Sequence, residues 1–243
     1  MPPGPFQVVL KMIFKDKLTP ATLIRRYKRF LADVTLESGE EITVHCPNSG
    51  SMKTCATPGW QVLLSKSDNP KRKYAYTWEM VYNNRCWIGI NTGIPNIITA
   101  EAIANNKIAD LRGFPVLRRE VKYGRNSRID ILLESKSKKC FIEVKNVTLV
   151  ESEDIYYFPD AVTERGRKHL HELAEMVRQG HRAVMFFVIQ RSDGRILSPA
   201  DHIDPAYGES LRKVYQSGVE IMAYRADVQP ESIELAGSVP IRL

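Results

Sequence analysis

Two carboxylates and a lysine occur close together in a pattern that could carry metal-dependent phosphate chemistry. Asp130 lies in the segment Arg128-Ile129-Asp130-Ile131, and Glu143-Val144-Lys145 follows after a short turn over 135–139. In a strand, Glu143 and Lys145 point to the same face because they are two residues apart. Paired carboxylates suit Mg²⁺ or Mn²⁺, and a nearby ammonium group stabilises an attacking water or a phosphate oxygen. We therefore predict Asp130, Glu143 and Lys145 as catalytic residues, with both carboxylates as metal ligands.

A hairpin would bring these residues together. If the turn is centred between Lys136 and Ser137, Asp130 lies opposite Glu143, and Arg128 lies opposite Lys145. Opposed side chains in a sheet are about 5 Å apart at Cβ, so the two carboxylates would repel each other without a cation or a shared proton. Replacing one of them should then stabilise the metal-free protein. Two alternatives are a polar face that is simply solvated and a salt bridge from Glu143 to Arg128 or Lys145.

The elements that must position this hairpin follow an αβββαβ order. We predict a helix from Thr99, its N-cap, to Asp110. Three strands, a long helix and a buried strand follow, over 116–123, 127–134, 140–147, 161–179 and 183–190. A further helix begins at Asp204-Pro205 and ends near Gly218, and a last strand covers Val219–Tyr224. The order predicts a restriction-endonuclease-like α/β domain over 91–243, with 91–96 as a linker-like stretch.

The preceding part of the chain is rich in short strands. We predict them at 29–36, 41–45, 61–65, 73–80 and 86–90, separated by turns rich in Gly, Asn and Ser. Five short strands in about 70 residues suit a small closed barrel such as an OB-fold. The fold class is therefore α+β, with an OB-like β-barrel over 1–90 followed by the α/β domain.

Positive charge is concentrated in this first part. The whole chain carries +7, of which +6 falls in residues 1–85. Cations neutralise phosphates and aromatic rings stack on bases, so two basic clusters with interleaved aromatics favour a polyanionic partner over a merely solubilising surface. The predicted DNA-binding residues are Arg25, Arg26, Lys28, Arg29, Lys71, Arg72 and Lys73, joined by Arg165, Arg167 and Lys168 at the start of the long helix, where phosphates are favoured.

Other classes of protein are disfavoured. No apolar run approaches the roughly 20 residues of a membrane span, so we expect no membrane partner. The four cysteines are too few for a disulfide scaffold and too widely spaced for a zinc ribbon, which favours a cytoplasmic location. His169 and His171 should point to different sides of their helix, so we do not expect them to form a metal-binding pair.

The pattern of Asp130 followed by Glu143-Val144-Lys145 resembles the PD-(D/E)XK nuclease signature, with Ile129 in place of the proline. Longer motifs, at 26–32, 45–52, 120–124, 127–130 and 158–166, resemble the sugar fermentation stimulation protein (SfsA) family from about residue 20 to the end of the chain. The resemblance implies DNA binding without strong sequence preference, an OB-like N-terminal domain and a nuclease-like C-terminal domain. The family's name derives from a role in maltose metabolism.

Related nucleases use an additional glutamate from the first helix as a metal ligand. That implication favours Glu101, with Glu120 on the following strand as the alternative. The sequence is compatible with an Mg²⁺- or Mn²⁺-dependent DNA nuclease. It is equally compatible with a non-specific DNA-binding regulator of sugar metabolism that keeps a nuclease fold without turnover. The sequence leaves the oligomeric state open.

Overall fold

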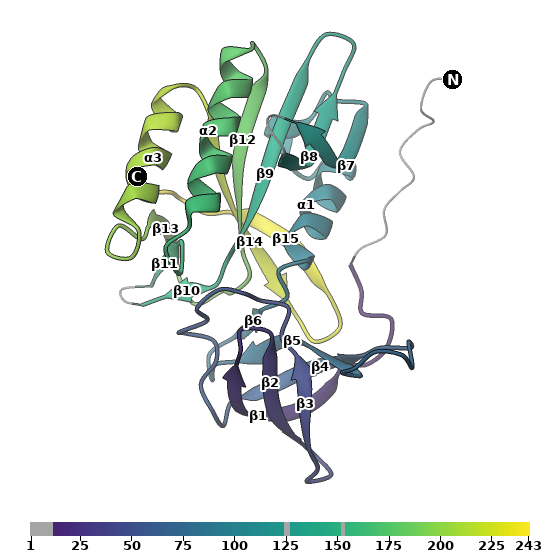
Figure 1. The fold of residues 1–243 in the computed structure, drawn as a ribbon. Helices are drawn as coiled ribbons and strands as arrows, with labels where there is room; N and C mark the ends of the chain where they lie inside the picture. Colours follow the sequence, from purple (N-terminus) through teal and green to yellow (C-terminus); the bar gives the residue numbers. More distant parts are fainter. Residues whose placement is uncertain (1–11, 124–126, 152–153) are drawn as a thin grey trace.

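The computed structural model describes residues 12–123, 127–151 and 154–243, so the predicted start of the first domain and Gly124 of one motif lie outside it. Figure 1 shows a β-barrel stacked against a larger α/β domain. Within the described residues, no helix is both long and apolar enough to span a membrane.

The barrel contains six strands, in the order β3-β2-β1-β4-β5-β6, and closes through a β3–β5 pairing of His45 with Thr77. Its interior is apolar and includes the fully buried Trp78. The predicted OB-like barrel is confirmed, but the first strand was missed, because only Ala21 and Leu23 of that strand are fully buried. The strands are β1 (Thr19–Tyr27), β2 (Leu31–Leu36), β3 (Glu41–His45), β4 (Gln61–Lys66), β5 (Tyr76–Tyr82) and β6 (Trp87–Gly89).

The α/β domain is built on a second six-stranded sheet, in the order β15-β14-β12-β9-β8-β7. A small sheet of β10, β11 and β13 lies beside it. The elements are α1 (Ile94–Ala104), a 3₁₀ turn (Ala109–Leu111), β7 (Val116–Tyr123), β8 (Ser127–Glu134), β9 (Lys139–Val147), β10 (Leu149–Val150), β11 (Ile155–Phe158), α2 (Glu164–Arg178), β12 (Arg182–Ile189), β13 (Ile196–Pro199), α3 (Pro205–Gln216), β14 (Glu220–Val228) and β15 (Ile233–Ser238).

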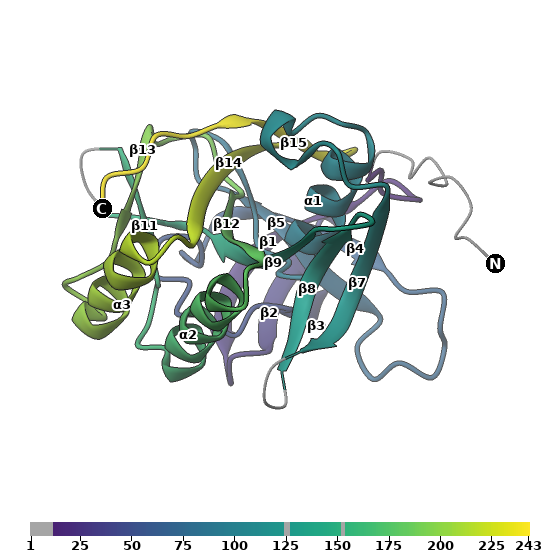
Figure 2. The ribbon, with the colours of Figure 1, turned by 90° about the horizontal axis from the view of Figure 1, so that it is seen from above.

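Helices cover both faces of this sheet, with α1 on one side and α2 and α3 on the other (Figure 2). Side chains along β9 alternate between the two layers. Ile142 and Val144 pack in the core that contains α1, whereas Phe141 packs in the core beneath α2 and α3. Because strand residues two apart share a face, Glu143 and Lys145 follow Phe141 and face α2.

The predicted start of the first helix is wrong. The helix begins at Ile94, five residues before Thr99, which is buried within it. Pro95 lies in the first turn, where its missing N–H costs nothing. The Asn91 side chain accepts a hydrogen bond from the Gly93 N–H just before the helix. The stretch 91–96 therefore leads directly into α1 and is not a linker. Four short strands, β10, β11, β13 and β15, were also not predicted.

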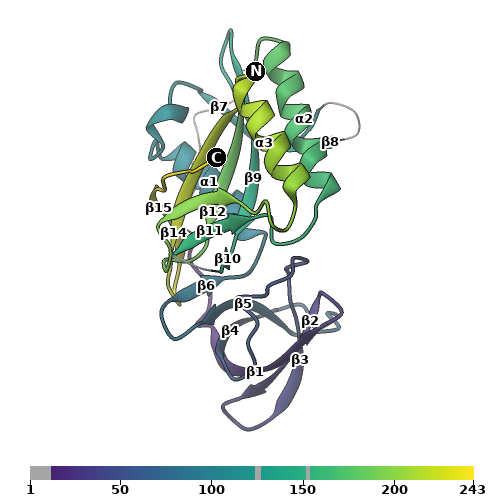
Figure 3. The ribbon, with the colours of Figure 1, turned by 90° about the vertical axis from the view of Figure 1, so that its left-hand side faces the viewer.

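Figure 3 shows the barrel and the α/β domain one above the other, and polar contacts join them. The Gly89 N–H donates to the Gln190 carbonyl at 2.9 Å, and the Asn83 amide donates to Asp193 at 2.7 Å. The buried Arg191 reaches Thr54 of the barrel at 3.1 Å while forming an ion pair with Asp193 at 2.6 Å. The segment just after β12 therefore fastens the two domains together.

Candidate active site

The β8–β9 hairpin has the predicted register, and the two strands separate at the candidate residues. The ladder runs from Glu134↔Lys139 to Ile131↔Ile142 and ends there. On its other side β9 pairs with β12 from Cys140 to Val147. Beyond the end of the β8–β9 ladder, the Asp130 carboxylate accepts a hydrogen bond from the Val144 N–H at 2.8 Å. The expected opposition of Arg128 and Lys145 is wrong, because the ladder between β8 and β9 ends at Ile131 and Arg128 is paired only on its other side, with Lys122 of β7, among the described residues.

Asp130 connects three elements. Its Oδ2 binds the backbone of β9, and its Oδ1 accepts a hydrogen bond from the Asn96 amide of α1 at 2.8 Å. Burial and the nearby charge of Glu143 raise the pKa of Asp130 to about 6. Asn96 is not among the predicted site residues, because the helix that carries it, α1, was predicted to start at Thr99. A polar residue directly after Pro95, in a first helical turn, was the available signal.

Glu143 is almost fully buried, with 3% of its surface exposed. Its Oε1 accepts hydrogen bonds from Lys145 Nζ, at 2.7 Å, and from His169 Nδ1. Burial alone would raise the pKa of Glu143, but the His169 hydrogen bond and the Lys145 charge hold it below its ordinary value. The other oxygen, Oε2, is buried and has no hydrogen-bond partner. The predicted salt bridge to Lys145, one of the two alternatives, is therefore present.

His169 of α2 is a site residue that the sequence analysis missed. It is 7% exposed, contacts Glu143, and lies 3.0 Å from Lys145 Nζ. Considering it only as half of a pair with the exposed His171 concealed this role. The signal was its place in the apolar stripe of the helix, between Gly166 and Leu173, which are both buried.

Asp130, Glu143 and His169 line a cavity of about 470 Å³, whereas Lys145, which donates to Glu143, is not part of the lining. Glu120 of β7 lies on this cavity, whereas Glu101 does not: its carboxylate is buried and accepts the Met12 N–H at 2.9 Å. Glu120, not Glu101, thus lies on the cavity that Asp130 and Glu143 line, and its role as a ligand stays a prediction. Among the described residues, no three His, Cys, Asp or Glu side chains form a group that could hold a metal by themselves. The lining residues are Glu120, Ser127, Arg128, Asp130, Glu143, Arg165, Lys168 and His169.

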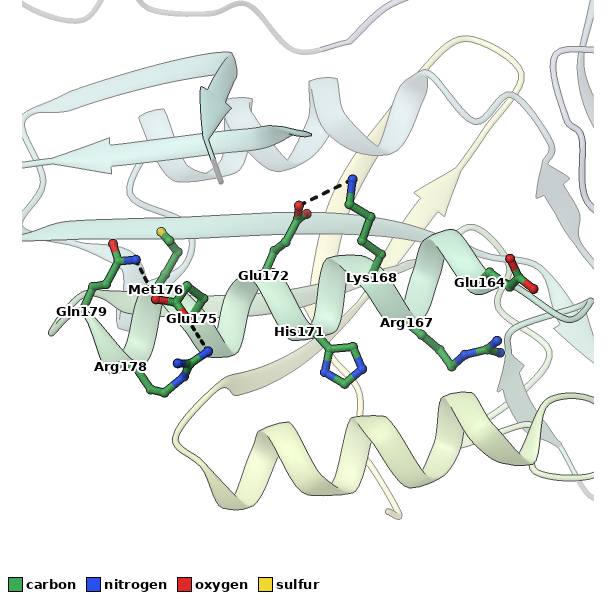
Figure 4. A pocket seen from close by; sticks show the side chains of 9 residues that line it. All are labelled: Glu164, Arg167, Lys168, His171, Glu172, Glu175, Met176, Arg178 and Gln179. Carbon is green, nitrogen blue, oxygen red and sulfur yellow. Dashed lines mark hydrogen bonds and ion pairs between the residues drawn. The ribbon is translucent and has the colours of Figure 1, made fainter. Parts of the chain in front are cut away.

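A larger hollow of about 880 Å³ follows the surface of α2 (Figure 4). Lys168 and Glu172 point to one side of the helix and form an ion pair at 3.7 Å, while Arg167 and His171 point towards α3. Farther along, Arg178 pairs with Glu175. Most of the charged side chains along this hollow have partners within the protein. The predicted catalytic carboxylates Asp130 and Glu143 line the smaller cavity instead, and Lys168 lines both.

The basic residues of the barrel divide into two groups. Lys28 and Arg29 occupy an exposed turn with positive φ, and Lys71 and Lys73 are also exposed. Arg26 instead donates to the main-chain carbonyls of residues 29, 48, 50 and 51, which ties the turn to the loop after β3. The guanidinium group of Arg26 therefore has an internal structural role, and its predicted contact with DNA stays a prediction.

Three other predicted DNA-binding arginines also have partners within the protein. Arg25 pairs with Asp33 at 2.8 Å and Arg72 donates to the Thr77 hydroxyl at 3.0 Å, although both arginines remain exposed. Arg167 forms an ion pair at 3.1 Å with the buried Asp204, the N-cap of α3. This pair joins the starts of α2 and α3, so Arg167 has a structural role in the fold, and its predicted contact with DNA stays a prediction.

Asp130→Asn should stabilise the metal-free protein at neutral pH. The folded protein holds a proton on Asp130 up to about pH 6, while the ordinary pKa is 3.8. The wild-type free energy of unfolding should therefore fall as pH rises from about 4 to 6, and the variant should lack much of this fall, gaining about 1–3 kcal/mol at pH 8. Urea unfolding in EDTA across this pH range measures the effect. Identical wild-type and variant profiles would contradict it.

The fold and the site define a class: a two-domain protein with an OB-like barrel and an α/β domain that presents an aspartate and a Glu-X-Lys motif where two central strands part. Residues 24–90 match the SfsA N-terminal OB domain, and residues 93–232 match the sugar fermentation stimulation protein RE domain. The chain belongs to the sugar fermentation stimulation protein (SfsA) family.

Relatives extend over nearly the whole chain. The homolog from Geotalea uraniireducens is 61% identical over 226 residues, which cover 93% of this chain and 97% of the relative. The homolog from Geobacter sulfurreducens is 57% identical over 230 residues, covering 95% and 98%. The structure of Pyrococcus furiosus SfsA in complex with Ca²⁺ is similar with a TM-score of 0.87, at 24% identity, covering 96% of this chain and 100% of that one.

Proposed function

We propose that this protein binds DNA without sequence preference and hydrolyses phosphodiester bonds with the help of a divalent cation. The observation that carries this proposal is the buried, unpartnered Oε2 of Glu143. A buried carboxylate oxygen without a partner is costly, and a cation is a partner that would offset this cost. A cytoplasmic location is part of the proposal, because all four cysteines are free thiols.

The residues of the cavity fit an oxygen-preferring cation. Glu143 and Asp130 would hold it, Glu120 is near enough to line the same cavity, and water and a phosphate would complete the shell. Bound there, Mg²⁺ or Mn²⁺ would activate water and offset charge on the phosphate. The Pyrococcus furiosus SfsA structure is a complex with Ca²⁺, a cation with the same preference for oxygen ligands. Lys145 would stabilise negative charge on the attacking water or the phosphate.

Incubation of the purified protein with single-stranded, duplex and branched DNA tests the proposal, with Mg²⁺, Mn²⁺ or EDTA present. We expect cation-dependent cleavage that Lys145→Met removes while DNA binding persists. One observation favours a second candidate, a DNA-binding regulator without turnover: no third carboxylate, histidine or cysteine completes a metal-binding group among the described residues. Binding without cleavage under every condition would support that candidate.

Binding should depend strongly on salt, because phosphate contacts release counterions. Replacing Lys28, Arg29, Lys71 and Lys73 together by Ala should weaken DNA binding and reduce the slope of log K against log salt by about 3–4, at roughly 0.9 per lost contact. Fluorescence anisotropy with two unrelated sequences measures both effects. The control is Lys136→Ala with Lys138→Ala, in the exposed β8–β9 turn. An unchanged slope in the fourfold variant would contradict a role for the barrel.

A further inference from the structure

We propose that His169 is a positioning residue that holds Glu143 with one oxygen occupied and the other directed to the cation. This inference rests on the proposed function and goes beyond it, because it concerns how the ligand is oriented. His169 comes from α2 and Glu143 from β9, so the contact depends on how the helix packs on the sheet.

The hydrogen bonds around the imidazole define its tautomer. Arg165 Nε donates to His169 Nε2 at 3.4 Å, so Nε2 is an acceptor. Nδ1 lies beside Glu143 Oε1, which can only accept, and 3.0 Å from Lys145 Nζ, which can only donate. Because the charged carboxylate is the stronger partner at this nitrogen, we assign the ring hydrogen to Nδ1. Arg165 thereby orients His169, as the outer partner of a ligating group usually does.

Lys145 and His169 converge on the same oxygen. Lys145 Nζ donates to Oε1 at 2.7 Å and lies 3.0 Å from His169 Nδ1, so two donors from different elements share one acceptor. Oε2 receives neither hydrogen bond and stays buried without a partner. With Oε1 held in this way, the carboxylate cannot rotate freely, and Oε2 is available to bind a cation.

If His169 only fills space in the core, its substitutions should change stability more than cation binding. If it donates a hydrogen bond that orients Glu143, removing that donor should weaken cation binding. Two substitutions separate these roles. His169→Phe keeps much of the volume and removes the donor, whereas His169→Asn loses volume and keeps an N–H at a position similar to that of Nδ1. If the hydrogen bond matters, His169→Phe should bind the cation more weakly than His169→Asn. If only packing matters, each variant should lose cation affinity in proportion to its loss of melting temperature.

Calorimetric titration with MnCl₂ and with MgCl₂, without DNA, measures cation binding by the wild type and both variants. We expect about 10–100-fold weaker binding by His169→Phe, the usual cost of losing an outer partner of a ligand, and binding by His169→Asn within about threefold of wild type. His171→Phe, at an exposed position two residues away, is the control and should bind as the wild type does.

The outcomes distinguish this inference from the proposed function. A wild type that binds neither cation would overturn the metal site and this inference with it. A wild type that binds, with His169→Phe binding equally well, would overturn the role of His169 alone. Imidazole ¹⁵N NMR on the metal-free wild type adds a test that needs no variant to fold: we expect the hydrogen on Nδ1, and a hydrogen only on Nε2 would overturn the inference.

Discussion

Glu143→Gln should abolish the rise in melting temperature that Mg²⁺ or Mn²⁺ gives the wild-type protein and lower any DNA cleavage by about 100-fold or more, as loss of a key electrostatic group does. In EDTA the variant should be less stable than the wild type by about 1–3 kcal/mol of unfolding free energy, because Lys145 and His169 lose an anionic partner in a buried setting. Its melting temperature should therefore be lower. Scanning calorimetry in EDTA and in each cation measures both effects.

The expected loss of stability in EDTA is the reverse of the expectation from the sequence. There the two carboxylates were taken as unpaired neighbours, so that replacing one of them should stabilise the metal-free protein. The structure gives Glu143 cationic and hydrogen-bonding partners, and leaves Asp130 with the raised pKa. Glu175→Gln, in an exposed ion pair on α2, is the matched control and should change little. A Glu143→Gln variant that gained as much stability from Mn²⁺ as the wild type would rule out Glu143 as a ligand.

Arg191→Met should cost about 3–5 kcal/mol of unfolding free energy, the usual effect of breaking a buried ion pair on one side. Arg191 and Asp193 are 3% and 4% exposed, and the same guanidinium group donates to the Thr148 carbonyl at 2.6 Å. The variant would leave Asp193 charged and buried without its cation, although the Asn83 amide still donates to it. Urea unfolding at pH 7 measures the loss.

The exposed pair of Lys15 and Asp68 offers a control of the same chemistry. Both side chains are more than three-quarters exposed and the pair is screened by solvent, so Lys15→Met should leave the free energy of unfolding unchanged within experimental error. Because Arg191 also reaches Thr54 in the barrel, its loss should loosen the domain junction and increase proteolysis near it. Equal losses for the Arg191 and Lys15 variants would contradict the importance assigned to this buried pair.

Local pattern was enough to predict the hairpin that carries the chemistry. Apolar residues in β8 and β9, with Lys136 and Ser137 in the turn between them, set a register that the structure confirms over Ile131–Glu134 and Lys139–Ile142. Such contacts join residues close in sequence, so alternation and turn composition suffice. The OB-like barrel and the family membership could be predicted for a similar reason, since short strands and long motifs are visible in the chain itself.

The predicted start of α1 shows how an error in one helix boundary also affects the predicted site. Beginning the helix at Thr99 instead of Ile94 left Asn96 in a supposed linker, so its hydrogen bond to Asp130 could not be anticipated. Arg26 is a different case, because it was predicted to bind DNA but has partners within the protein. Its surroundings in sequence are those of a DNA-binding residue, yet its partners are carbonyls of a loop more than 20 residues away. Charge alone does not reveal which cations have internal partners.

The sequence by itself determined the candidate chemistry, an aspartate and a Glu-X-Lys motif on neighbouring strands, together with the class of each domain. Only the tertiary structure decided which groups surround them: His169 arrives from α2, and Glu120, not Glu101, lines the cavity. The physical reason is that strand pairing and side-chain periodicity are encoded locally, whereas the partner of a buried charge depends on how distant elements pack. Packing gave Glu143 two donors on one oxygen and none on the other.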